Sequence, residues 1–181
     1  MVGVRLLFIT ASALFISDGS RAQPADNLKC AYRGGNFCYQ VKAAHKVNQQ
    51  ALNRLDGVLD GEGRRKLAEA DKLVMELLTK AKQDLLASLK EALKAELGAL
   101  DSVKVDCYRL SKEHQLSKES TCRAVYDDIG YGTDALIKAI IEIDPSKETK
   151  IQTLYTSTIL GNKIHEVVTA VLGDEELWQQ L

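Results

Sequence analysis

The chain has 181 residues, with 24 Lys and Arg against 25 Asp and Glu, and a formal net charge of −1. A nearly neutral chain without a basic segment lacks the electrostatic footprint of a nucleic-acid-binding protein. The length beyond residue 22 fits one domain with its own hydrophobic core. We therefore expect a single domain over residues 23–181 and no nucleic-acid partner.

The first 22 residues have the order of a secretory signal peptide. Arg5 precedes an apolar run from Leu6 to Ile16, and small and polar residues follow as far as Ala22. This run is shorter than the roughly 20 apolar residues that a membrane-spanning helix needs. We therefore predict a signal peptide over residues 1–22, secretion to the extracellular space, and no integral membrane segment.

Long helical tracts are predicted because only two prolines interrupt a chain rich in Leu, Ala, Lys and Glu. The first tract, about residues 36–59, repeats apolar residues every three or four positions and is ended by the glycines of DGVLDGEG. The second, about residues 64–103, carries an unbroken apolar stripe that includes Ala81. As one helix it would be a rod of about 60 Å.

Two further helices are predicted in the second half of the chain. The third starts near Ser117 and ends near Ile143, and Gly130 and Gly132 favour a break in its middle. The segment DPSKE then gives a stop and a restart. The last helix covers about residues 151–172, and DEELWQQL follows it as a short terminal turn.

Four helices with mostly short connections predict an all-α fold, an antiparallel up-down-up-down four-helix bundle with one long helix. In that arrangement the start of the first helix, the end of the second and the start of the third meet at one pole. The four cysteines fall at those three places, so we expect two disulfides at one pole. They are Cys30, Cys38, Cys107 and Cys122.

An even number of cysteines behind a signal peptide indicates disulfides, because the secretory route is oxidising. The spacings C-x7-C and C-x14-C do not fit a zinc site, and the redox spacing C-x-x-C is absent. Three pairings remain open from the sequence. We favour the two local ones, Cys30 with Cys38 and Cys107 with Cys122, although a shared pole would also allow pairs between the segments.

No catalytic, phosphate-binding or metal-binding motif is present in the sequence, so we expect no enzyme and no cofactor. His45, His114 and His165 lie on different segments, and we interpret them as surface or hydrogen-bonded residues rather than metal ligands. Arg64 and Arg65 follow an exposed glycine turn and resemble a dibasic processing site. The intact chain is the default, because the flanking segments are patterned to pack on each other.

Two functional hypotheses follow. The leading one is a non-enzymatic binding protein for a small apolar ligand or lipid, because the apolar faces of the second and third helices are wider than a narrow seam. The alternative is a secreted effector, of a salivary, venom or signalling type, that binds another extracellular protein through the Tyr-rich pole fixed by the disulfides. Those residues are Tyr32, Phe37, Tyr39, Tyr108 and Tyr126. An apolar end of the long second helix also leaves a homodimer open.

In overall pattern, residues 23–181 resemble the small secreted helical proteins of insect and other arthropod fluids. The predicted architecture is also similar to exchangeable apolipoproteins and to helical cytokines. It differs from the former in having disulfides, and from the latter in its short loops, which exclude the long crossovers of an up-up-down-down bundle. The resemblance implies an extracellular protein and assigns no role to any single residue.

Overall fold

The computed structural model describes residues 29–59, 61–112, 118–158 and 163–179, and the predicted signal peptide over residues 1–22 lies outside them. The described part is 84% helix and contains no strand, which confirms the predicted all-α class. Short 3-10 turns precede α3 and α5. The α-helices of this part are α1 (Phe37–Leu55), α2 (Glu62–Leu77), α3 (Leu85–Lys112), α4 (Glu119–Ile143), α5 (Glu148–Ser157), α6 (Ile164–Gly173) and α7 (Glu175–Trp178).

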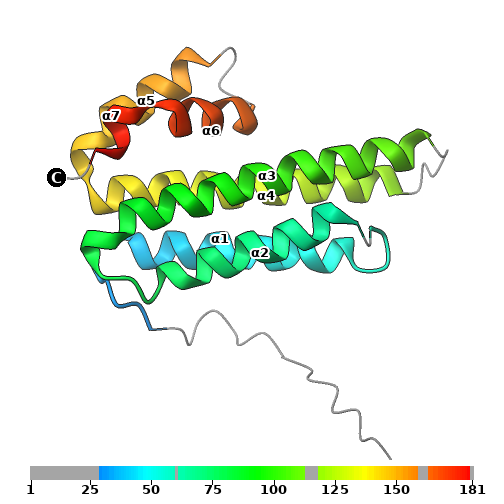
Figure 1. Cartoon of the computed structure of the whole chain (residues 1–181), viewed down its shortest axis with the longest axis horizontal. Coiled ribbons are helices and arrows are strands. Elements are labelled where there is room, and N and C mark those ends of the chain that lie inside the picture. The colour runs from blue at the N-terminus through cyan, green and yellow to red at the C-terminus, as the bar shows by residue number, and fades with distance from the viewer. Residues whose placement is uncertain (1–28, 60, 113–117, 159–162, 180–181) are drawn as a thin grey trace, which may run out of the picture.

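Helices α1 to α4 lie side by side, and each runs opposite to the one before it (Figure 1). α1 packs on α2 and α4, and α3 packs on the same two helices, so the four enclose one core. We call these four helices the bundle. Helices α5, α6 and α7 fold back over one part of the α3–α4 side of the bundle, and we call them the C-terminal layer (Figure 1).

The predicted second helix, residues 64–103, is two helices in the structure. α2 ends at Leu77, the chain turns at Ala81, and α3 begins at Leu85. Leu77 and Leu85 are fully buried, whereas Ala81, predicted to face the core, is exposed. The reversal lets the apolar stripes of α2 and α3 pack on each other, and this burial outweighs the helix propensity of the turn sequence TKAKQD. The prediction of one long helix is wrong.

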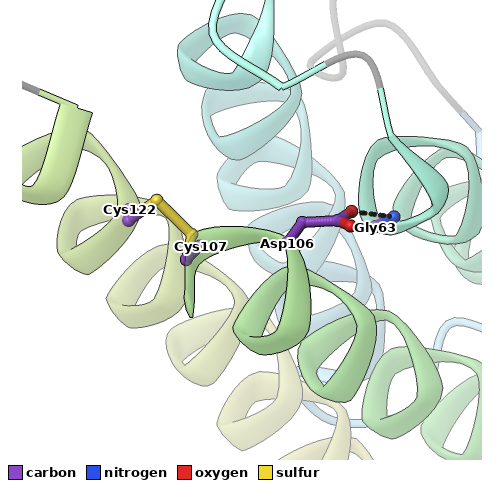
Figure 2. The surroundings of a disulfide bond; sticks show 4 residues. All are labelled: Gly63, Asp106, Cys107 and Cys122. Carbon is purple, nitrogen blue, oxygen red and sulfur yellow. Dashed lines mark hydrogen bonds between the residues drawn. A yellow bond between two sulfur atoms is a disulfide. The ribbon is translucent and has the colours of Figure 1, made fainter. Parts of the chain in front are cut away.

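This added reversal places the two disulfides at opposite ends of the bundle. Cys30–Cys38 fastens the start of α1, whereas Cys107–Cys122 joins the end of α3 to the start of α4 (Figure 2). Their Cα atoms lie 6.0 and 5.9 Å apart, and both bonds are the local pairs favoured from the sequence. The prediction of a single cysteine pole is wrong, because α3 ends far from the start of α1.

α4 runs unbroken through Gly130 and Gly132, where the sequence favours a break. A Cβ on Gly130 would lie 3.1 Å from Cγ2 of Ile164 in α6, and one on Gly132 would lie 2.9 Å from Oδ1 of Asn48 in α1. Both glycines therefore allow another helix, α6 or α1, to pack closely against α4, and neither forms a turn. The packing that they allow offsets their poor helix propensity.

The predicted last helix, residues 151–172, is also two helices, α5 and α6, which contact each other. The split lets the apolar residues of α6 pack against α3 and α4. The predicted terminal turn is present as α7, and Trp178 Nε1 donates a hydrogen bond to the backbone oxygen of Val171 at 2.9 Å. This bond holds α7 against α6.

The buried apolar residues form two clusters, one toward each end of the bundle. The larger cluster contains Phe37 of α1 and extends into the C-terminal layer, and the smaller one contains Leu55 of α1. Buried polar residues on all four helices lie between the clusters, and we call them the polar layer. The polar layer consists of His45, Asn48, Asp71, Glu96 and Thr133.

Candidate functional site

A groove lies where the start of α6 meets the middle of α4, and we call it the α4–α6 groove. Its volume of about 590 Å³ falls within the range of pockets that bind small molecules, roughly 300–1,000 Å³. α4 supplies one wall, α5 and α6 supply the other, and α3 contributes a lysine. Its lining includes Lys104, Tyr126, Gly130, Tyr131, Tyr155 and Ile164.

Tyr155 fixes the α5 wall of the groove. Its hydroxyl donates to Oδ1 of Asp134 in α4 at 2.5 Å, and Nζ of Lys138 lies 2.6 Å from Oδ2 of the same carboxylate. Burial and the neighbouring carboxylate raise the pKa of Tyr155 far above its usual value, so the phenol keeps its proton and continues to donate. α5 is therefore tethered to α4 at neutral pH.

Two contacts fix the first turn of α6. Ile164 packs against the bare backbone of Gly130, and Nε2 of His165 lies 2.9 Å from Oδ1 of Asp101 in α3. A side chain at position 130 would meet Ile164 and force the start of α6 outward. The glycine in one wall and the hydrogen bond beside it thus hold the start of α6 close to α4 and α3.

The groove presents aromatic, cationic and acidic groups to a ligand, since Asp127, Asp134 and Glu166 also line it. The side chain of Tyr131 is 69% exposed, and Tyr126 is partly buried, with a pKa raised by burial and by the charge of Asp101. Lys104 is exposed and forms no hydrogen bond or ion pair with the described residues. Aromatic rings supply apolar contact area, and an unpaired ammonium attracts an anionic group. The lining therefore suits an amphipathic small molecule.

Inside the bundle, the polar layer holds a carboxyl group that no cation pairs among the described residues. Glu96 of α3 is fully buried, and its Oε1 accepts a hydrogen bond from Nδ2 of Asn48 in α1. Oε2 of Glu96 and Oδ1 of Asn48 have no partner in the described part of the chain. Burial raises the pKa of Glu96 to about 8, because the charged form loses its hydration there.

The histidines lie as surface or hydrogen-bonded residues where they are described. Nδ1 of His45 lies 2.9 and 3.0 Å from the two carboxylate oxygens of Asp71, and Gln49 donates to the same carboxylate. His165 contacts Asp101, and His114 lies outside the described residues. Within the residues that the structure describes, no three His, Cys, Asp or Glu side chains gather where they could hold a metal ion.

The five aromatic residues expected at one pole lie in three places. Phe37 is fully buried at the start of α1, and Tyr32 meets it edge-on, with ring centroids 5.4 Å apart. Tyr39 is 70% exposed near the same end, whereas Tyr108 is exposed at the opposite end, next in the chain to Cys107 of the second disulfide. Tyr126 lines the α4–α6 groove. The expected single aromatic pole is therefore absent, for the same reason as the single cysteine pole.

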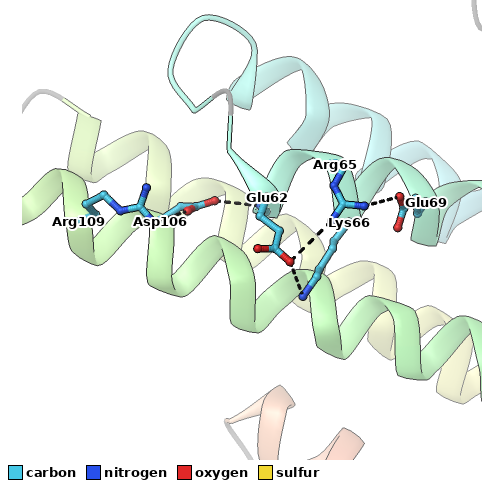
Figure 3. Close-up of polar contacts among 7 residues, drawn as sticks. Glu62, Arg65, Lys66, Glu69, Asp106 and Arg109 are labelled. Atoms are coloured by element: carbon cyan, nitrogen blue, oxygen red, sulfur yellow. Dashed lines mark hydrogen bonds and ion pairs between the residues drawn. The ribbon is translucent and has the colours of Figure 1, made fainter.

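Arg64 and Arg65, the dibasic pair, lie inside the first turns of α2. Arg65 forms ion pairs with Glu62 and Glu69 at 3.7 and 2.8 Å (Figure 3), and Nη2 of Arg64 lies 3.5 Å from Oδ1 of Asp56. Proteolytic nicking prefers exposed loop tips to hydrogen-bonded helix. This geometry favours the intact chain.

Sequence patterns identified neither the groove nor the polar layer. Glu96 stands in the apolar stripe of α3, four residues after Ala92 and three before Ala99, and a charged residue at such an inward position is a signal of a buried polar site. The groove has no comparable signal, because it forms only where α6 folds onto α3 and α4.

Comparisons with protein-family models, with curated proteins and with solved structures find no match to this chain. Across the described ranges, no helix is both long and apolar enough to cross a membrane. Function is therefore inferred from the residues and their geometry.

Proposed function

We propose that the protein is a secreted, non-enzymatic helical binding protein that holds a small amphipathic ligand, such as a lipid, in the α4–α6 groove. The observation that carries the proposal is the exposed aromatic and cationic lining of a groove large enough for a small molecule. The site differs from the one expected between the helices, because the wide apolar faces of the predicted second and third helices, which are α2, α3 and α4 in the structure, are used in the two core clusters.

An extracellular location is supported by the two disulfides and by the order of the first 22 residues. Disulfides persist in oxidising compartments and are rare where thiols are kept reduced. Disulfides at both ends of the bundle also suit a binding protein, because a groove that is already formed loses less conformational entropy when the ligand binds.

The groove chemistry suggests how the ligand lies. Tyr126 and Tyr131 lie five residues apart along α4, and both line the groove. Their rings can contact the apolar part of a ligand. Lys104 approaches from α3 and suits an anionic head group. Asp134 is already engaged by Tyr155 and Lys138, so it competes little for the ligand.

The proposal is tested on the secreted, oxidised protein. Organic extraction followed by mass spectrometry should identify a co-purified amphiphile, and titration with anilinonaphthalene sulfonate or a fluorescent fatty acid should show saturable binding. Tyr131→Ala and Lys104→Ala should each weaken binding about tenfold, the equivalent of roughly 1.4 kcal/mol. Tyr39→Ala, an exposed tyrosine at one end of the bundle, is the matched control and should bind as the wild type does. Absence of saturable binding would overturn the proposal.

A second candidate function is contact with a protein partner through the outer face of the last turns of α3. Val105 and Tyr108 are 60% and 62% exposed there, and Nζ of Lys112 lies 4.9 Å from the centre of the Tyr108 ring. Exposed apolar and aromatic groups on a rigid helix suit protein contact. A photo-cross-linking residue at position 108 should capture one defined extracellular protein, or a second copy of the chain, that the same residue at position 39 does not capture. Equal capture at both positions would contradict this candidate.

A further inference from the structure

The Glu96 carboxyl group lies in an environment that disfavours its charge. Glu96 is fully buried between the two core clusters. The charged groups facing it are Asp71 of α2, which repels a second negative charge, and His45 of α1, which is engaged by Asp71. α4 contributes only the uncharged Gly132 and Thr133 at this level, and the buried residues of α6 are apolar.

A buried carboxylate without a cation is so unfavourable that such a group takes up a proton instead. A protonated carboxyl group has one O–H donor and keeps an acceptor oxygen, and an amide side chain has N–H donors and one carbonyl acceptor. The Asn48 amide already donates to Oε1 of Glu96. Oε2 of Glu96 and Oδ1 of Asn48 are both buried without a partner among the described residues, and a proton on Glu96 would supply the donor that this pair of acceptors lacks.

We propose that Glu96 is a proton-binding site of the folded bundle, at neutral pH a carboxylic acid whose Oε2–H donates to Oδ1 of Asn48 while its Oε1 accepts from Nδ2. The acid and the amide then form a closed pair of hydrogen bonds that links α3 to α1. Loss of the proton to solvent leaves a carboxylate that faces the Asn48 carbonyl oxygen and the Asp71 carboxylate, and both contacts are repulsive. Gly132 supports the pair, since a Cβ there would lie 2.9 Å from Oδ1 of Asn48.

The proton makes the bundle respond to pH. The pKa of Glu96 is raised in the folded protein from 4.5 to about 8. Between these two values the folded protein holds one proton more than the unfolded chain, so stability falls as the pH rises. The contribution of Glu96 to stability is complete below pH 4.5, is lost progressively between pH 4.5 and about 8, and changes little above that pH, where the folded protein also releases the proton. For one proton the unfolding equilibrium constant rises about tenfold per pH unit.

The first test reads the proton on the wild-type protein. Carboxyl ¹³C shifts of labelled glutamate are followed by NMR between pH 3 and 10, and the Glu96 signal is assigned as the one that Glu96→Gln removes. We expect this signal to titrate near pH 8. A Glu96 signal that titrates below pH 6 would overturn the proposal.

The second test measures urea unfolding between pH 5.5 and 8.5. Glu96→Gln keeps the shape of the side chain, and its amide can donate to Oδ1 of Asn48 as the proposed acid does. The variant should lose most of the wild-type pH dependence over this range. Glu91→Gln, on the same helix but exposed, is the matched control and should follow the wild type. An unchanged pH dependence in Glu96→Gln would overturn the proposal, and the NMR titration decides the matter if that variant does not fold.

Discussion

Oδ2 of Asp106 in α3 accepts a hydrogen bond from the backbone N–H of Gly63, in the first turn of α2, at 2.9 Å (Figure 2). The first N–H groups of a helix have no partner within it, so a buried carboxylate of a neighbouring helix caps α2 here. Close approach depends on the glycine, since a Cβ on Gly63 would lie 2.8 Å from the backbone nitrogen of Val103. The cap stands next to Cys107, so one short segment fixes α2 and α4 to α3.

Removal of this cap should destabilise the protein. Asp106→Ala leaves the Gly63 N–H buried without its acceptor, and we expect the free energy of unfolding to fall by about 1–2 kcal/mol. Urea denaturation followed by circular dichroism measures the change. Asp127→Ala, an exposed aspartate of α4, should change stability by less than about 0.5 kcal/mol. Equal effects of the two substitutions would show that Asp106 is no cap.

The disulfide pairing predicts which peptides remain joined. Proteolysis without reduction, followed by mass spectrometry, should recover Cys30 with Cys38 and Cys107 with Cys122. Replacing the second pair by alanines should cost about 3 kcal/mol, and replacing the first about 2.5 kcal/mol, because the closed segments span 15 and 8 residues. A peptide that joins Cys30 or Cys38 to Cys107 or Cys122 would contradict the opposite placement of the two bonds.

The helical class and the local disulfides could be predicted because they depend on signals close together in the chain. The turn between α2 and α3 could not, because TKAKQD has no glycine or proline and its residues favour helix. Only the mutual burial of the stripes around Leu77 and Leu85 forces the reversal. Without that turn, α3 and α4 are predicted to run in the opposite direction to the one they take, which places the cysteines and most of the tyrosines at one pole.

The loss of stability at acidic pH should depend on Asp144. Its carboxylate accepts hydrogen bonds from Ser146, and this contact, with the nearby Lys147, lowers the pKa of Asp144 below 3.8 despite burial. The contribution is therefore present above pH 4 and is lost as the pH falls through the lowered value. Asp144→Ala should reduce stability by about 1 kcal/mol at pH 6 and flatten the loss below pH 4. Urea unfolding between pH 2.5 and 6 measures both effects, and an unchanged acid limb would contradict the assignment.

The α5 wall should loosen when its tether is removed. Tyr155→Phe deletes the hydroxyl that donates to Asp134, so the amides of α5 should exchange hydrogen faster while those of α1 to α3 are unchanged. Native-state hydrogen exchange with mass spectrometry gives this readout by segment. Tyr131→Phe removes an exposed hydroxyl from the same groove and should leave exchange in α5 at the wild-type rate. Uniform acceleration across all helices would indicate global destabilisation instead.

No pattern in the sequence predicts that the residues of the candidate site lie close together in the fold. The sequence places Tyr126 among several aromatics near the cysteines, whereas Tyr131 and Lys104 give no signal, since single exposed tyrosines and lysines on helices are ordinary. The sequence favours a helix break at Gly130, but α4 continues through this glycine, which lets Ile164 of α6 pack against it. Such contacts depend on how α6 docks, and no local pattern encodes that.

Ligand binding in the α4–α6 groove is tested most directly by amide chemical-shift mapping of the ¹⁵N-labelled, oxidised protein during titration with anilinonaphthalene sulfonate. We predict saturable shifts concentrated in residues 126–134 and 163–167, with a smaller set around Lys104 and none around Tyr39. Shifts that centre on the buried leucines of α2 and α3, or on Tyr108, or that fail to saturate, would contradict a binding site in this groove.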